Sequence, residues 1–226
     1  MKPANGFLRL MGLFRASTMD KDNGPEGKTP WHKKTTKGGN EIYKALLKEM
    51  EGPIGKRAIS LLLESCSRSC LTASLPQDAI LQIFAEHLKG KRPAGIAETI
   101  QPLLNVSRED INAICQVVAS KASTAMTQAR AQGSGANWYC WRTCEDQRVR
   151  DSHKHMDKVL VRWDKPPDPE AIIGEPPAGT YHAGECDGCR CYPEPVVSLG
   201  FLKPPLKVHI DGKVVKMTKT KFKELL

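Results

Sequence analysis

Three cysteines that lie within six residues of one another have the types and spacing of metal ligands. Cys186, Cys189 and Cys191 follow the pattern C-x-x-C-x-C, and Gly188 between them allows the backbone to turn tightly. Thiolates gathered by such a turn suit Zn²⁺, which takes four ligands, with sulfur at roughly 2.3 Å and nitrogen at roughly 2.0–2.1 Å. The pattern therefore predicts a zinc site, with unligated thiols or a disulfide as the alternative.

A histidine is the expected fourth ligand. His153, His155 and His182 all lie between Trp138 and Tyr192, a stretch that also holds five of the eight cysteines and three of the four tryptophans. Spacing alone does not choose between the three histidines. Residue types that build cores and hold metals are thus concentrated in about a quarter of the chain.

Short strands are expected to position these residues. Residues 138–143 alternate in a way that predicts a strand with one buried face, and residues 159–163 predict a second strand. Five prolines in residues 166–177 predict a loop without ladder pairing of its own. The fold expected for residues 136–198 is therefore a small mixed α/β domain stapled by zinc.

A helical region is expected in front of this domain, over residues 41–132, because apolar residues recur there at helical spacing. Ser74 and Ser107 are the predicted N-caps of two of its helices. Cys66 and Cys70 are interpreted as buried thiols rather than as ligands. The predicted fold class is α+β. The predicted helices cover residues 41–50, 54–71, 74–88, 94–104 and 107–130.

Both ends of the chain are strongly basic. The formal net charge is +9, of which residues 1–40 and residues 199–226 contribute +5 each, so the rest is nearly neutral. The composition of residues 1–40 predicts a disordered tail. The sequence of residues 199–226 predicts a second tail that contains a β-hairpin with its turn at Asp211-Gly212. Such tails bind phosphates or acidic surfaces, which makes DNA an expected partner, or they are simply solvated. No apolar run approaches the ~20 residues of a membrane span.

A family resemblance rests on one set of residues: Trp141, Thr143, Asp146, Arg148, Val149, Arg150 and His153, followed by Cys189-Arg190-Cys191-Tyr192. In this order and separation they resemble the Mu F-like head morphogenesis family, the minor head proteins of tailed bacteriophages. The family pairs the segment that ends in the histidine with the later C-R-C. The resemblance therefore favours His153 as the fourth ligand; His182, which is nearest to the cysteines in sequence, is second and His155 is third.

The resemblance implies a minor head protein that contacts the portal and capsid or scaffold proteins. It implies action in head morphogenesis, DNA packaging or genome delivery, in the head interior or at the portal vertex of the virion, with assembly in the host cytoplasm. We expect no enzymatic activity, because three cysteines and a histidine close a zinc site. The alternatives are a zinc-dependent nucleic-acid-binding module and a metal-dependent nuclease. On the structural interpretation, Asp146, Arg148 and Arg150 share one strand edge, where acids and bases pair.

Overall fold

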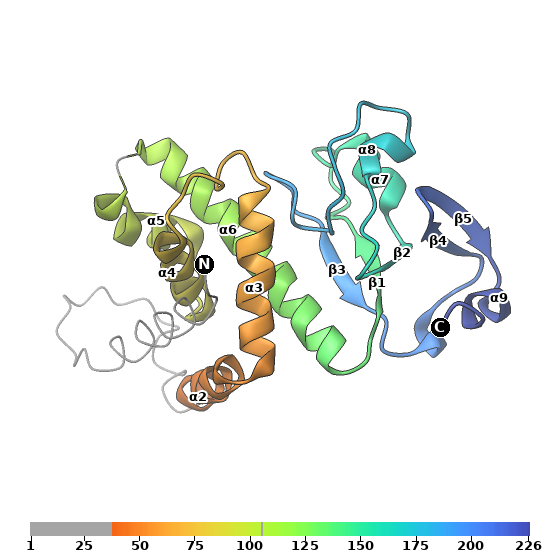
Figure 1. Cartoon of the computed structure of the whole chain (residues 1–226), viewed down its shortest axis with the longest axis horizontal. Helices are drawn as coiled ribbons and strands as arrows, with labels where there is room; N and C mark the ends of the chain where they lie inside the picture. Colours follow the sequence, from red (N-terminus) through yellow and green to blue (C-terminus); the bar gives the residue numbers. More distant parts are fainter. Residues whose placement is uncertain (1–37, 105) are drawn as a thin grey trace.

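The computed structural model describes residues 38–104 and 106–226, so the prediction for the tail before residue 38 lies outside the described residues. The helices of residues 38–133 lie on one side of the molecule, and the sheet with its short helices lies on the other; the C-terminal end of the longest described helix leads into the sheet (Figure 1). The fold class is α+β, as predicted. No helix in the described part of the chain is long and apolar enough to cross a membrane.

The helical side has one core of its own, formed by buried side chains such as Leu62, Phe84 and Val118. Pro53 separates the first two described helices, because its ring suits the first turn of a helix and not the interior. The elements are α2 (Gly38–Glu51), α3 (Pro53–Ser67), α4 (Gln77–Leu88), α5 (Pro93–Ile100), η1 (Gln101–Leu103) and α6 (Arg108–Gly133).

Two helix predictions were wrong in detail, and one was confirmed. Helix α3 ends at Ser67, and Ser74 does not cap α4, whose N-cap is Pro76 without a side-chain hydrogen bond. The early end of α3 leaves Cys70 exposed, although Cys66 is buried as expected. Ser107 does cap α6, because its hydroxyl accepts a hydrogen bond from the backbone N–H of Asp110 at 3.0 Å.

The sheet has the strand order β3-β1-β2-β4-β5. Strand β1 pairs antiparallel with β2 and β3, β4 pairs antiparallel with β5, and β2 pairs parallel with β4. No sequence pattern predicted β3, because it contains two prolines, which cannot donate ladder hydrogen bonds and are tolerated only in an edge strand such as this one. The strands are β1 (Trp138–Arg142), β2 (Val159–Arg162), β3 (Tyr192–Pro195), β4 (Leu206–Ile210) and β5 (Lys213–Met217).

Strand β1 is buried on both faces, which corrects the prediction of one buried face. Tyr139 and Trp141 lie in the core on one side of the sheet, and Trp138 and Cys140 lie in the core on the other. Alternation in the sequence reflects two different cores rather than a core and solvent. The second core includes Phe222, whose ring meets the ring of Trp138 edge to face at 4.9 Å.

Residues 199–226 are not a separate tail, because their hairpin continues the sheet through the β2–β4 pairing. The predicted turn is present, with φ of 47° at Asp211 and 76° at Gly212, as a type I′ turn requires. A lone hairpin is marginal in water, so pairing with β2 explains its formation. Helices η2 (Leu199–Phe201) and α9 (Lys219–Lys223) flank it.

Two short helices interrupt stretches in which none was predicted. Helix α7 (Asp151–Met156) follows β1, and α8 (Pro169–Ile172) interrupts the proline-rich loop. Asp168 caps α8 by accepting a hydrogen bond from the backbone N–H of Ala171 at 3.0 Å. Both helices lie near the sheet and contact each other (Figure 1).

Candidate metal centre

His153 lies in α7 and points into the core on one side of the sheet. It is 2% exposed, and its ring meets that of the fully buried Trp141 edge to face at 5.5 Å. The aromatic strand predicted from the sequence therefore forms a wall of the site. Because α7 is held against this wall, the orientation of the imidazole is fixed by packing.

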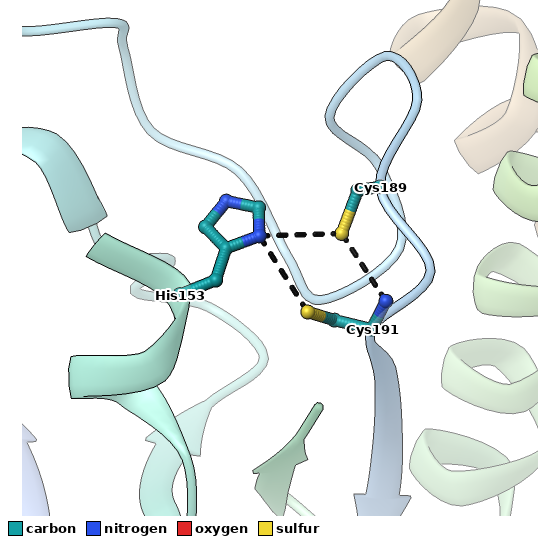
Figure 2. A group of neighbouring side chains, drawn as sticks. All are labelled: His153, Cys189 and Cys191. Carbon is teal, nitrogen blue, oxygen red and sulfur yellow. Dashed lines mark hydrogen bonds between the residues drawn. The ribbon is translucent and has the colours of Figure 1, made fainter. Parts of the chain in front are cut away.

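Cys189 and Cys191 approach the same ring nitrogen of His153 (Figure 2). The distances from Nδ1 are 3.4 Å to Sγ of Cys189 and 3.5 Å to Sγ of Cys191. The backbone N–H of Cys191 donates a hydrogen bond to Sγ of Cys189 at 3.2 Å. The three possible ligand atoms all lie within 4.8 Å of one another. Residues separated by almost forty positions therefore form one cluster, which we call the His–Cys cluster.

The other ring nitrogen of His153 is held by a tyrosine and a glutamate that the sequence did not reveal. Nε2 lies 2.9 Å from the hydroxyl of Tyr181, which donates to the carboxylate of Glu170 at 2.7 and 2.8 Å. Histidines that bind metals commonly have such a partner on the second nitrogen, because it fixes the ring and its tautomer. No spacing rule could find these two residues, since Glu170 comes from α8 inside the predicted loop.

The cluster favours a negative charge on sulfur. Hydrogen bonds from Cys191 and His153 lower the pKa of Cys189 to about 4, although burial opposes this shift. Burial alone would lower the pKa of His153, but interactions with Cys186 and Cys189 raise it to about 9. The hydrogen bond with Cys189, together with burial, raises the pKa of Cys191. These shifts favour a thiolate at Cys189 beside a protonated ring at His153 and a neutral thiol at Cys191.

Cys186 lies beside the cluster but outside its three atoms. Nη1 of Arg150 donates to Sγ of Cys186 at 2.6 Å, and Nη2 of Arg150 donates to the backbone O of Asp187 at 2.8 Å. The side chain of Cys186 is half-buried. Gly188 has a φ of 71°, so the turn expected between the cysteines is present.

The two other candidate histidines are placed elsewhere. Nδ1 of His182 lies 3.1 Å from the hydroxyl of Tyr139, and its ring packs against Trp163 at 5.3 Å. His155 is exposed on α7, two positions from His153. His153 is therefore the histidine that the described structure brings to the cysteines, and His182 is a buried core residue.

Asp146, Arg148 and Arg150 do not lie on a strand edge, which corrects that prediction. They lie in the turn between β1 and α7, where a carboxylate oxygen of Asp146 is 2.6 Å from Arg190 and 3.6 Å from Arg148. Arg190 lies between the two cysteines of the cluster. The ion pair with Asp146 therefore connects the turn to the loop of residues 186–191 that carries the three cysteines, which we call the cysteine loop. Because the ion pair is exposed to solvent, it contributes little to stability.

The distances in the His–Cys cluster fit the edges of a tetrahedral zinc site. Bonds of roughly 2.3 Å to sulfur and 2.0–2.1 Å to nitrogen at the tetrahedral angle place the two ligand atoms about 3.6 Å apart. The observed separations of 3.4 and 3.5 Å are close to this value. The residues that could hold a metal are therefore His153, Cys189 and Cys191, with Cys186 as the next thiol in the same loop.

The comparison with a family of known proteins covers this site. Residues 83–193 match the family described as Phage Mu protein F like protein. That range contains α6, strands β1 and β2, and all three residues of the His–Cys cluster.

A protein of Haemophilus influenzae, described as an uncharacterized protein, is 30% identical over 121 residues, which are 54% of this chain and 24% of that protein. The matched part is thus about a quarter of that relative. No solved structure matches the chain significantly. Across residues 83–193 the chain matches the Phage Mu protein F like family, which supports its assignment to the Mu F-like phage proteins and suggests a phage head morphogenesis or minor capsid protein.

Proposed function

We propose that the protein is a minor head protein that contacts the portal and acts in head morphogenesis, DNA packaging or genome delivery. The observation that carries this proposal is the family match, which covers both the helix that supports the sheet and the His–Cys cluster. The protein would reside in the head interior or at the portal vertex of the virion, and in the host cytoplasm during assembly. Capsid or scaffold proteins are its further proposed partners.

The His–Cys cluster serves in this proposal as a structural zinc centre. Zinc supplies a cross-link between α7 and the cysteine loop, which a sheet with short strands cannot provide by itself. The supporting observations are the two sulfurs at one nitrogen of His153 and the tyrosine at its other nitrogen. Cys186 is the remaining candidate ligand. With Cys186 as the fourth ligand, the centre would be closed by three thiolates and an imidazole and would have no open position for water, so we propose a structural role and no nuclease activity.

Contact with the portal is tested by capture experiments. We expect the full chain to retain the portal protein of the same phage, and to retain it equally well when Cys144 is changed to serine, since that thiol is exposed and outside the cluster. The measurement is co-purification of the two proteins expressed together. Failure of the full chain to capture the portal at any ionic strength would contradict the proposed contact.

DNA is the second proposed partner, and the basic C-terminal segment, residues 203–223 with the hairpin and α9, is the described surface that favours it. Many lysine and arginine side chains in residues 68–190 form ion pairs with carboxylates; Arg130, for example, lies 2.6 Å from Glu49. Within the described residues, the lysines from Lys203 to Lys223 form no ion pair. Lys207 and Lys216 even face each other across β4 and β5. Like charges at such positions repel, and a phosphate between them would remove the repulsion.

DNA binding should weaken when these lysines lose their charge. We expect glutamine at Lys213, Lys216, Lys221 and Lys223 to reduce the slope of log K against log salt by roughly 0.9 for each phosphate that is no longer neutralised. The measurement is fluorescence anisotropy with a short duplex across a salt series, in which the duplex should also remain uncut. The control carries the same charge change at lysines that are already paired: Lys89, Lys91, Lys154 and Lys158. Equally weakened affinity in both variants would contradict the assignment to the basic C-terminal segment.

A further inference from the structure

A buried lysine joins the helical side of the molecule to the loop that carries the cysteines. Lys121 in α6 is 3% exposed, and its Nζ donates to the backbone O of Glu185. The same nitrogen lies 3.6 Å from the carboxylate of Asp187. Two of its partners are therefore the residues immediately before and after Cys186, and a third is the hydroxyl of Ser65 in α3, at 3.4 Å. A buried ammonium group is costly unless it is paired and hydrogen-bonded, so this arrangement fixes the loop to the helix.

Two further side chains of α6 hold the same loop. The hydroxyl of Ser120 donates to the backbone O of Gly184 at 2.8 Å, and that of Thr124 donates to the backbone O of Ala183 at 2.9 Å. Three consecutive carbonyls, at residues 183–185, thus accept hydrogen bonds from one helix. Positions 120, 121 and 124 lie on one face of α6, because residues four apart are one turn apart.

The connection between α3 and α4 completes the attachment. The hydroxyl of Ser69 lies 2.7 and 2.8 Å from the two carboxylate oxygens of Asp187, and the thiol of Cys70 lies 3.3 Å from one of them. Residues 183–187 are therefore held from two parts of the helical side. We call this set of contacts the loop clamp: Ser69, Ser120, Lys121 and Thr124 with their partners in residues 183–187.

We infer that Lys121 is a positioning residue of the zinc centre, because the loop clamp holds the backbone that leads into the cysteines. This inference rests on the proposed zinc centre and assigns part of its affinity to α6. A loop that is ordered before the metal arrives loses less conformational entropy on binding, so it binds more tightly. Outer contacts of this kind typically change metal affinity 10–100-fold.

The coupling is reciprocal. If the clamp strengthens zinc binding, zinc must strengthen the contact between α6 and the loop by the same factor. Zinc should therefore slow amide hydrogen exchange in α6 around Lys121, although this helix supplies no ligand. A purely local zinc site would slow exchange in α7 and the cysteine loop and leave α6 unchanged.

The test compares zinc affinities of the full chain, measured by competition with a chromogenic chelator. We expect Lys121→Met to weaken zinc binding by about 10–100-fold. Since that variant could fail to fold, a second one removes the two hydroxyl donors through Ser120→Ala and Thr124→Val, with an expected decrease of about 10-fold. Folding of each variant is checked by circular dichroism and by its melting transition without metal.

The matched control uses the same residue types on the same helix. Ser123 and Thr127 donate to carbonyls of their own helix, those of Ala119 and Ser123, and not to the loop. The Ser123→Ala and Thr127→Val double variant should bind zinc like the wild type and show the same zinc-dependent exchange in α6. If the Ser120 and Thr124 double variant binds zinc as tightly as this control, the inference is overturned and the zinc centre stands. Absence of zinc binding by the wild type would instead overturn the zinc centre, and the inference with it.

Discussion

Replacing His153 by alanine is expected to abolish stoichiometric zinc binding and to lower the melting temperature of the sheet. The imidazole contacts both sulfurs of the cluster, so its removal deletes the ligand that ties α7 to the cysteine loop. Zinc at a free concentration 1,000 times its Kd contributes about 4 kcal/mol, which corresponds to roughly 10 °C for a chain of this size. Elemental analysis and thermal unfolding with and without chelator measure the effect. Cys189→Ser should behave in the same way.

The helices should survive this change in large part. Their core is formed by their own side chains, such as Leu62 and Phe84, and is distinct from the two cores of the sheet. The near-ultraviolet signal of Trp141 should therefore fall more than the far-ultraviolet helical signal. His155→Ala and Cys144→Ser are the matched controls, since both side chains are exposed and outside the cluster. Metal-free wild-type protein with a melting transition unaffected by chelator would refute the zinc centre.

Alanine at Gly184 is expected to destabilise the fold by about 3 kcal/mol. Gly184 has a φ of 89°, and a Cβ there would lie 2.6 Å from Oγ1 of Thr124 and 2.9 Å from the backbone O of Cys191. The collision would force the loop away from α6 and so open the loop clamp. Chemical denaturation measures the free energy of unfolding.

Gly179→Ala separates the collision from the backbone cost. Its φ of 93° is similar, but a Cβ there would meet nothing within 4 Å. This control should be destabilised by roughly 1–2 kcal/mol, the cost of a left-handed backbone for a residue with a Cβ. Equal destabilisation by the two alanines would show that close approach of the loop to α6 does not matter for stability.

Local patterns in the sequence were sufficient where one signal decides the structure. The serine cap of α6 and the Asp211-Gly212 turn form as predicted, because a capping hydroxyl and a positive φ act over a few residues. The turn at Gly188 also forms as predicted, and His153, which the family resemblance favoured, lies beside two of the three cysteines; the binding of zinc by these residues stays a prediction.

Patterns failed where distant segments decide the environment. Alternation along β1 could not show that solvent is absent from both of its faces, because the second core is built from β4 and α9, far along the chain. The hairpin was predicted only as part of a basic tail, because β2, the strand with which it pairs, lies more than forty residues earlier in the chain. His182 is nearer than His153 to the cysteines in sequence, yet its ring is committed to Tyr139 and Trp163.

The sequence by itself determined which residues could bind a metal, that helices precede a small sheet, and where the charge is concentrated. Tertiary structure decided which histidine contacts the cysteines, which residue binds its second nitrogen, and which groups pair with the buried charge of Lys121. The physical reason is that ligand type and secondary-structure preference are properties of single residues and short segments. Distances between atoms of α6, α7, α8 and the cysteine loop are set by packing of the whole chain.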